Sequence, residues 1–167
     1  MGKIISRLIW FFGLVVLQIF VLNRIQWFGV ATPFLYIYLI LTMDHSMSRN
    51  SLMLWAFAIG LVVDILSNTF GIHAAASTFI AFIRPVLLRL FFLRDENELF
   101  EPGIRVMGTG AFWHYALTCT VIHSSVVCLL QFFSLSHPLM LLTRILACTL
   151  LTMVFVMAIE FLRSRKL

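Results

Sequence analysis

The sequence predicts an all-α polytopic membrane protein that forms a single transmembrane domain over residues 1–167. Three observations indicate this class. Of the 167 residues, 62% are hydrophobic and only 11% are charged, whereas a soluble domain carries about 25% charged residues. The apolar residues fall into six segments, each close to the roughly 20 residues that cross a hydrocarbon core. The short connections leave no space for a soluble domain, which excludes nucleotide-binding and nucleic-acid-binding domains.

The six expected spans lie at about 5–23, 28–43, 51–67, 71–92, 106–133 and 138–162. The first span begins like a signal peptide, but no small-x-small cleavage site follows, so we expect it to remain in the protein. The second and third spans are short, and the fifth is long enough to tilt in the bilayer. We expect each of these four spans to cross the membrane once.

The fourth span is interrupted by Arg84 and Pro85. Proline disfavours helix at the residue before it, so the segment either crosses with a kink or turns to lie in the cytoplasmic interface as a basic amphipathic helix. In both cases we expect Arg84 and Arg89 to extend their charged groups toward the cytoplasmic headgroups.

The distribution of Lys and Arg predicts that both termini are cytoplasmic, because basic residues accumulate on the inner side of a membrane. Six spans place both ends of the chain on one side. The other side would carry only Arg24 and Arg144, out of 12 basic residues in the chain. The formal net charge of +5 comes from basic residues that lie at the ends of the apolar runs, so it does not indicate a nucleic-acid partner.

Asp64 is the only carboxylate well inside the apolar runs. It lies roughly 5 Å from the outer turn and Arg144 roughly 9 Å into its span, whereas Arg84 lies roughly 20 Å past the turn. Matching depth favours an Asp64–Arg144 pair over an Asp64–Arg84 pair. Two interpretations stay open: a site for a partner, ion, proton or solute, or a structural residue that pairs with Arg144 or caps the turn at Ser67 and Asn68.

Small residues indicate close packing of the third and fourth spans. Gly60 lies one helical turn before Asp64, and Ala74, Ala75, Ala76 and Ser77 open the fourth span. Small side chains let neighbouring helices approach closely. We therefore expect a tight hairpin.

No enzyme motif is found in the sequence. HExxH, GxSxG and CxxC are absent, so we expect no catalytic residue, no cofactor and no metal site. His114 and His123 lie roughly 13 Å apart on one helix, too far to share a metal ion. Interhelical hydrogen bonds are the better interpretation. We expect Glu160 to lie at the opposite depth from Asp64, near Arg163, Arg7 and Arg84.

Several short motifs occur in a characteristic order. "LQIFVLNRI" closes the first span, "ATPFLYIYLIL" makes the second, "GLVVDIL" closes the third, and "FGIHAAASTFIAFIRPVLL" follows. This order resembles the rod shape-determining protein MreD family, in its Bacteroidetes-type form. The resemblance covers roughly residues 15–92 and includes Gln18, Pro33, Gly60, Asp64 and Gly71.

The resemblance implies a small, non-enzymatic scaffold or regulator of peptidoglycan elongation in the bacterial inner membrane, where it maintains rod cell shape. The implied partners are an MreC-like single-span protein, MreB filaments, and a RodA-type glycosyltransferase with its transpeptidase. The implied fold is similar to the membrane subunits of energy-coupling-factor transporters. Asp64 matches an aspartate of the family that has no settled role.

Candidate residues for structural or partner contacts are Pro33, Gly60, Asp64, Gly71, Arg84 and Arg144. A chain with so little mass outside the membrane can present helix faces to a partner, or place cytoplasmic arginines against anionic lipid. The rival interpretation is a solute-binding membrane subunit of a transporter. Its cavity would be lined by Asp64, His73, His114 and Arg144.

Overall fold

The structure is a computed structural model that describes residues 13, 18, 32–92, 100–132 and 138–166. Within these ranges it is all helical and has no strand. The helices are α2 (Ile37–Thr42), α3 (Arg49–Ser67), α4 (Ile72–Phe91), α5 (Ile104–Met107), α6 (Thr109–Phe132) and α7 (Pro138–Lys166). Four of them, α3, α4, α6 and α7, are long and apolar enough to cross a membrane. The expected all-α class with membrane-length helices is confirmed.

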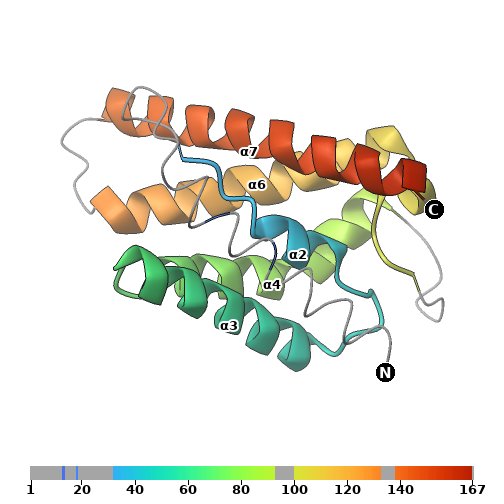
Figure 1. Cartoon of the computed structure of the whole chain (residues 1–167), viewed down its shortest axis with the longest axis horizontal. Helices are drawn as coiled ribbons and strands as arrows, with labels where there is room; N and C mark the ends of the chain where they lie inside the picture. The colour runs from blue at the N-terminus through green and yellow to red at the C-terminus, as the bar shows by residue number, and fades with distance from the viewer. Residues whose placement is uncertain (1–12, 14–17, 19–31, 93–99, 133–137, 167) are drawn as a thin grey trace.

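The four long helices pack as two hairpins. Helix α3 packs against α4, α6 packs against α7, and α4 joins the hairpins by packing against α6. Figure 1 shows the short helix α2 between the hairpins. The centre of the bundle is therefore occupied by a connecting segment as well as by helix faces.

Four of the six expected spans correspond to long helices in the structure. The ranges 51–67, 71–92 and 138–162 match α3, α4 and α7, and 106–133 begins slightly later, at Thr109 of α6. The later start has a local cause, because Gly108 adopts a positive φ of 80° that separates α5 from α6. The first expected span, 5–23, lies outside the described residues except for Gly13 and Gln18.

The second expected span, 28–43, differs from the prediction in its described part. Residues 32–34 are not helical, 35–36 form a turn, and only then does α2 follow. A helix of six residues is about 9 Å long, far shorter than the roughly 30 Å hydrocarbon core. Apolar composition predicted a spanning helix here, but irregular backbone is tolerated at membrane depth where protein surrounds it.

The turn between α3 and α4 explains the role of Gly71. Asn68 ends α3 with a φ of 54°, and Gly71 precedes α4 with a φ of 76°. Both lie in the left-handed region, which glycine adopts without steric cost and asparagine tolerates. Two such residues within four positions reverse the chain directly into α4.

Helix α4 continues through Pro85 and ends at Phe91. The helix is therefore continuous at Arg84–Pro85, and both alternatives, a kinked crossing and a turn into the cytoplasmic interface, stay predictions. Proline inside a helix removes one backbone hydrogen bond, and membrane helices tolerate this loss where neighbouring groups compensate.

The outward faces of α3, α4 and α7 are large and apolar, with residues spaced three, four or seven apart. Exposed positions on these faces are Leu54, Leu61, Ile65, Phe79, Phe82, Val86, Leu142, Leu146, Leu150 and Val154. In water such faces would promote aggregation. In a bilayer they are the surface that meets acyl chains or another transmembrane helix.

Gly60 lies where the backbones of α3 and α4 approach each other closely. A methyl group added there would lie 2.5 Å from the carbonyl oxygen of His73 and 2.6 Å from the backbone nitrogen of Ala74. Backbone atoms cannot rotate away as side chains can. The expected tight hairpin is confirmed, and its cause is the missing side chain of Gly60.

We predict that Gly60→Ala destabilises the protein by about 1–3 kcal/mol or more, because the added methyl group must push two helix backbones apart. Gly110→Ala is the matched control, since Gly110 is also helical but has open space around it. Its effect should stay within about 1 kcal/mol. Thermal unfolding of both variants in detergent micelles tests this, and equal midpoints would contradict the close approach.

Candidate functional site

The segment 32–43 runs through the bundle interior, and every residue from Pro33 to Leu41 is buried. Much of it is not helical, so its N–H and C=O groups lack the partners that a helix provides. A bilayer core offers no water to replace them, and each unpaired group is costly. The partners of this segment's polar groups therefore decide which other residues the bundle requires.

Gln18 and Thr152 hold the start of the segment. The Gln18 amide donates to the carbonyl oxygen of Pro33 at 2.7 Å and accepts from the backbone N–H of Leu35 at 2.8 Å. The N–H of Phe34 donates to the Thr152 hydroxyl at 2.9 Å. Pro33 itself has no N–H, so it needs no donor partner at this buried position. This accounts for the predicted importance of Pro33.

Arg84 and Tyr115 hold the other end of the segment. Arg84 Nη2 donates to the carbonyl oxygens of Leu41, at 3.1 Å, and of Met43, while Tyr115 donates to Leu41 at 3.2 Å. Arg84 Nε also donates to the Tyr115 hydroxyl at 2.9 Å. A cation at a helix C-terminus satisfies its last carbonyls and its dipole, so Arg84 caps α2.

The expected position of Arg84 at the cytoplasmic headgroups is therefore wrong. Its side chain is among the largest fully buried ones in the described chain, with 2% exposure. Arg89, one and a half turns later on α4, is exposed. The difference arises because α2 ends beside Arg84 with carbonyl groups that need a donor, a requirement that hydropathy does not reveal.

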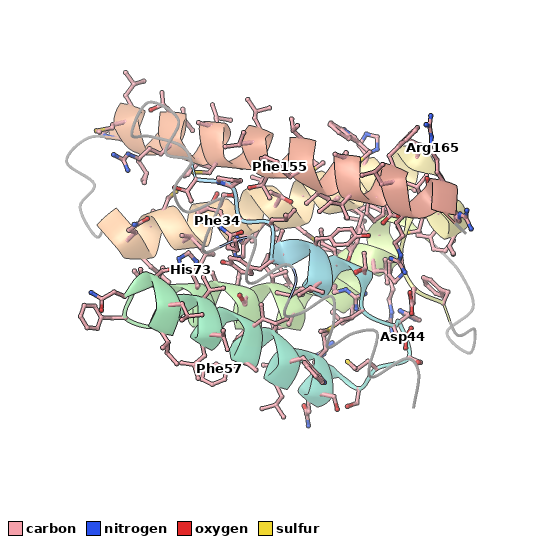
Figure 2. All side chains as sticks on the ribbon, in the orientation of Figure 1. Phe34, Asp44, Phe57, His73, Phe155 and Arg165 are labelled. Carbon is pink, nitrogen blue, oxygen red and sulfur yellow. The ribbon has the colours of Figure 1, made fainter. Side chains whose placement is uncertain are left out.

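Tyr36 joins two histidines in the centre of the bundle. Its hydroxyl lies 2.8 Å from Nδ1 of His73 on α4 and 2.9 Å from Nε2 of His123 on α6. The ring of Phe34 packs on both imidazoles, with centroids 5.6 Å and 5.5 Å away. Figure 2 labels Phe34 and His73 close together beside the central segment. His123 thus bonds to the turn before α2 and not to a second helix, and His114, for which an interhelical bond was also expected, contacts the Gly110 carbonyl of its own helix.

Glu160 on α7 makes contacts near the end of the bundle that carries the C-terminus (Figure 1). Its carboxylate accepts from the Tyr38 hydroxyl at 2.7 Å and from the backbone N–H of Ile104 at 2.9 Å. Arg163 lies 3.9 Å from the same carboxylate and also pairs with Glu101. The predicted proximity of Glu160 and Arg163 is confirmed, whereas Arg7 lies outside the described residues and Arg84 bonds to Tyr115 and to the end of α2. Glu160 fastens both α2 and α5 to α7.

Asp64 caps the N-terminus of α4. Its carboxylate accepts from the backbone N–H of His73 at 3.1 Å, from that of Ala74 at 2.8 Å, and from the Thr69 hydroxyl. A carboxylate at this position satisfies free N–H groups and is favoured by the helix dipole. Asp64 thus joins the two helices that Gly60 brings together.

The expected Asp64–Arg144 pair does not form, because the carboxylate takes its hydrogen bonds from the α3–α4 hairpin. Arg144 is half-buried near the start of α7. His114 is exposed on α6, where its Nδ1 lies 2.8 Å from the carbonyl oxygen of Gly110. Of the four residues expected to line a solute cavity, only Asp64 and His73 are brought together by the contacts described.

Four residues of this polar interior were missed in the sequence: Tyr36, Tyr38, Tyr115 and Thr152. Each is a polar side chain within an apolar run, which is the available signal. Hydropathy treats tyrosine and threonine as tolerable in such runs. Their roles depend on a neighbouring backbone that is not helical, and composition did not predict that.

The chemistry of the described interior is mainly that of hydrogen bonding to backbone. Gln18, Thr152, Arg84, Tyr115 and Glu160 each bind main-chain N–H or C=O groups. Among the residues that the structure describes, no three His, Cys, Asp or Glu side chains are grouped to hold a metal ion. Comparisons with protein-family models, curated proteins and solved structures gave no match.

We predict that Arg84→Met destabilises the protein by about 2–4 kcal/mol, because it leaves the buried carbonyls of Leu41 and Met43 without a charged donor. Arg89→Met on the same helix is the control, since it alters an exposed arginine and should change stability by less than about 0.5 kcal/mol. Unfolding of both variants in one detergent is the measurement. Equal stabilities would show that Arg84 does not hold α2.

Proposed function

We propose that this protein is a non-enzymatic scaffold or regulator of the peptidoglycan elongation machinery in the bacterial inner membrane, of the MreD type. It acts by binding an MreC-like single-span protein, and through it MreB filaments and a RodA-type glycosyltransferase with its transpeptidase. The proposal rests on one observation, which is that the buried polar side chains bind the chain's own backbone. The contacts of Gln18, Arg84, Thr152 and Glu160 hold the chain's own backbone.

What the described helices offer to other molecules is their outward faces. On α3, Leu54 and Ile65 are 69% and 70% exposed, whereas Ile59 and Val63 face inward. Transmembrane helices associate through such faces by packing and by occasional hydrogen bonds. A partner with a single span fits this kind of surface, and little of the described chain lies outside the helices.

The motifs that resemble the MreD family include residues with defined structural roles. Gln18 and Pro33 start the central segment, and Gly60, Asp64 and Gly71 build the α3–α4 hairpin. These roles support the proposal, because a family defined by such residues would share this bundle.

The arrangement of basic residues supports an orientation with both termini in the cytoplasm. Arg49 begins α3, Arg89 lies in the last turn of α4, Arg105 lies in α5, and Arg165 lies near the end of α7. Figure 1 shows these helix ends at the end of the bundle that carries the C-terminus. We propose that this end meets the anionic inner leaflet.

Site-specific photo-crosslinking in living cells tests the proposal. A crosslinking amino acid at Leu54, Ile65 or Leu150 should capture a single-span protein, because these side chains point out of the bundle. The same amino acid at Ile59 or Val63 is the matched control and should capture none. Depletion of the protein should also round the cells.

Two results would contradict the scaffold. The first is an absence of crosslinks from every outward face together with normal cell shape after depletion. The second is purification of the chain with a bound solute and no protein partner, which would favour the membrane subunit of a transporter. Crosslinks that appear equally at inward and outward positions would mean that the variants are misfolded.

A further inference from the structure

Three polar atoms on one face of α6 have no hydrogen-bond partner among the described residues. They are the hydroxyl oxygens of Thr120 and Ser124 and Nδ1 of His123, and all three side chains are fully buried. Positions three and four apart lie on the same side of a helix. The three atoms are therefore clustered within about one turn.

The hydroxyls of Thr120 and Ser124 differ from several other helical serine and threonine hydroxyls in the protein. Serine and threonine inside a helix often bond to the carbonyl four residues earlier, and Ser77, Thr118 and Ser125 do so here, at 2.7–2.9 Å. Thr120 and Ser124 do not. They keep both donor and acceptor capacity toward the bundle interior, beside a ring nitrogen that is also unpaired.

The direction of the hydrogen bonds at Tyr36 determines whether Nδ1 of His123 is a donor or an acceptor. The Tyr36 hydroxyl has one proton, so it donates to at most one imidazole and accepts from a ring nitrogen that carries a proton. With both rings uncharged, donation to His73 leaves Nδ1 of His123 as an acceptor, and donation to His123 leaves it as a donor. A bound small molecule that can both donate and accept a hydrogen bond therefore satisfies Nδ1 of His123 in either arrangement.

The charged side chains around this site indicate that the bound molecule is uncharged. The Asp64 carboxylate, the nearest acid on α3, is already bonded to Thr69, His73 N–H and Ala74 N–H. Arg84 lies eleven residues beyond His73 on α4, about 16 Å away by helical rise. Neither side chain therefore binds an ion at His123 directly, and isolated charge in such an interior is costly.

We propose that Thr120, His123 and Ser124 form an internal site for a small, uncharged hydrogen-bonding molecule, and that Tyr36 links this site to His73. Water is the simplest molecule of this chemistry, because buried waters typically bond to about three otherwise unsatisfied polar groups. The site stands independently of the proposed scaffold function. With a molecule bound in this site, Tyr36, His73 and His123 form a chain of hydrogen bonds. The donors and acceptors along this chain can all exchange roles together.

Solid-state NMR of the full chain in lipid nanodiscs tests the site, with ¹⁵N-labelled histidine and magnetisation transferred from water. We expect transfer from water to the His123 ring, and its loss in the Thr120→Val, Ser124→Ala double variant. Thr118→Val with Ser125→Ala is the control, because those hydroxyls bond to their own helix. If the double variant does not fold, Ser124→Ala alone should weaken the transfer.

Native mass spectrometry of the same preparations distinguishes water from a solute. A compound retained by the wild-type chain and lost from the double variant would identify a solute of the same chemistry, and retention of no compound together with the NMR transfer would identify water. The proposal is overturned if the wild-type chain shows neither water transfer to His123 nor a retained compound. It is also overturned if the double variant keeps either signal unchanged.

Discussion

The backbone of residues 32–43 lies among the membrane-length helices without being a complete helix, and the rest of the bundle is arranged around that constraint. Lipid cannot satisfy its N–H and C=O groups, so side chains from other helices must. Gln18 and Thr152 bind its start, and Arg84 and Tyr115 bind its end. The polar residues inside the apolar runs are thus explained mainly by the segment that they surround.

The same constraint links the two hairpins. Tyr36 contacts His73 on α4 and His123 on α6, and Tyr38 contacts Glu160 on α7. Packing alone gives membrane helices little preference between neighbours, since lipid is as apolar as their side chains. Hydrogen bonds to a shared central segment supply a specific arrangement and leave the outer faces for lipid or partner proteins.

Hydropathy predicted the class and the ranges of α3, α4, α6 and α7, because long apolar runs have few other stable states in a membrane. It also predicted the close approach at Gly60, where a small residue has a direct geometric meaning. It failed for the described part of the second expected span, residues 32–43, and for Arg84. Whether an apolar segment spans as a helix or lies inside a bundle depends on distant partners such as Gln18, and composition does not encode those contacts.

Hydrogen exchange of the backbone amides of Phe34 and Leu35, measured in lipid nanodiscs, tests the central claim most directly. The account predicts that both amides exchange as slowly as amides in the middle of α4, and that Thr152→Val selectively accelerates Phe34, because Thr152 is its acceptor. Exchange in the wild-type chain as fast as at the exposed turn residue Phe70 would contradict the account, since the segment would then be open to water.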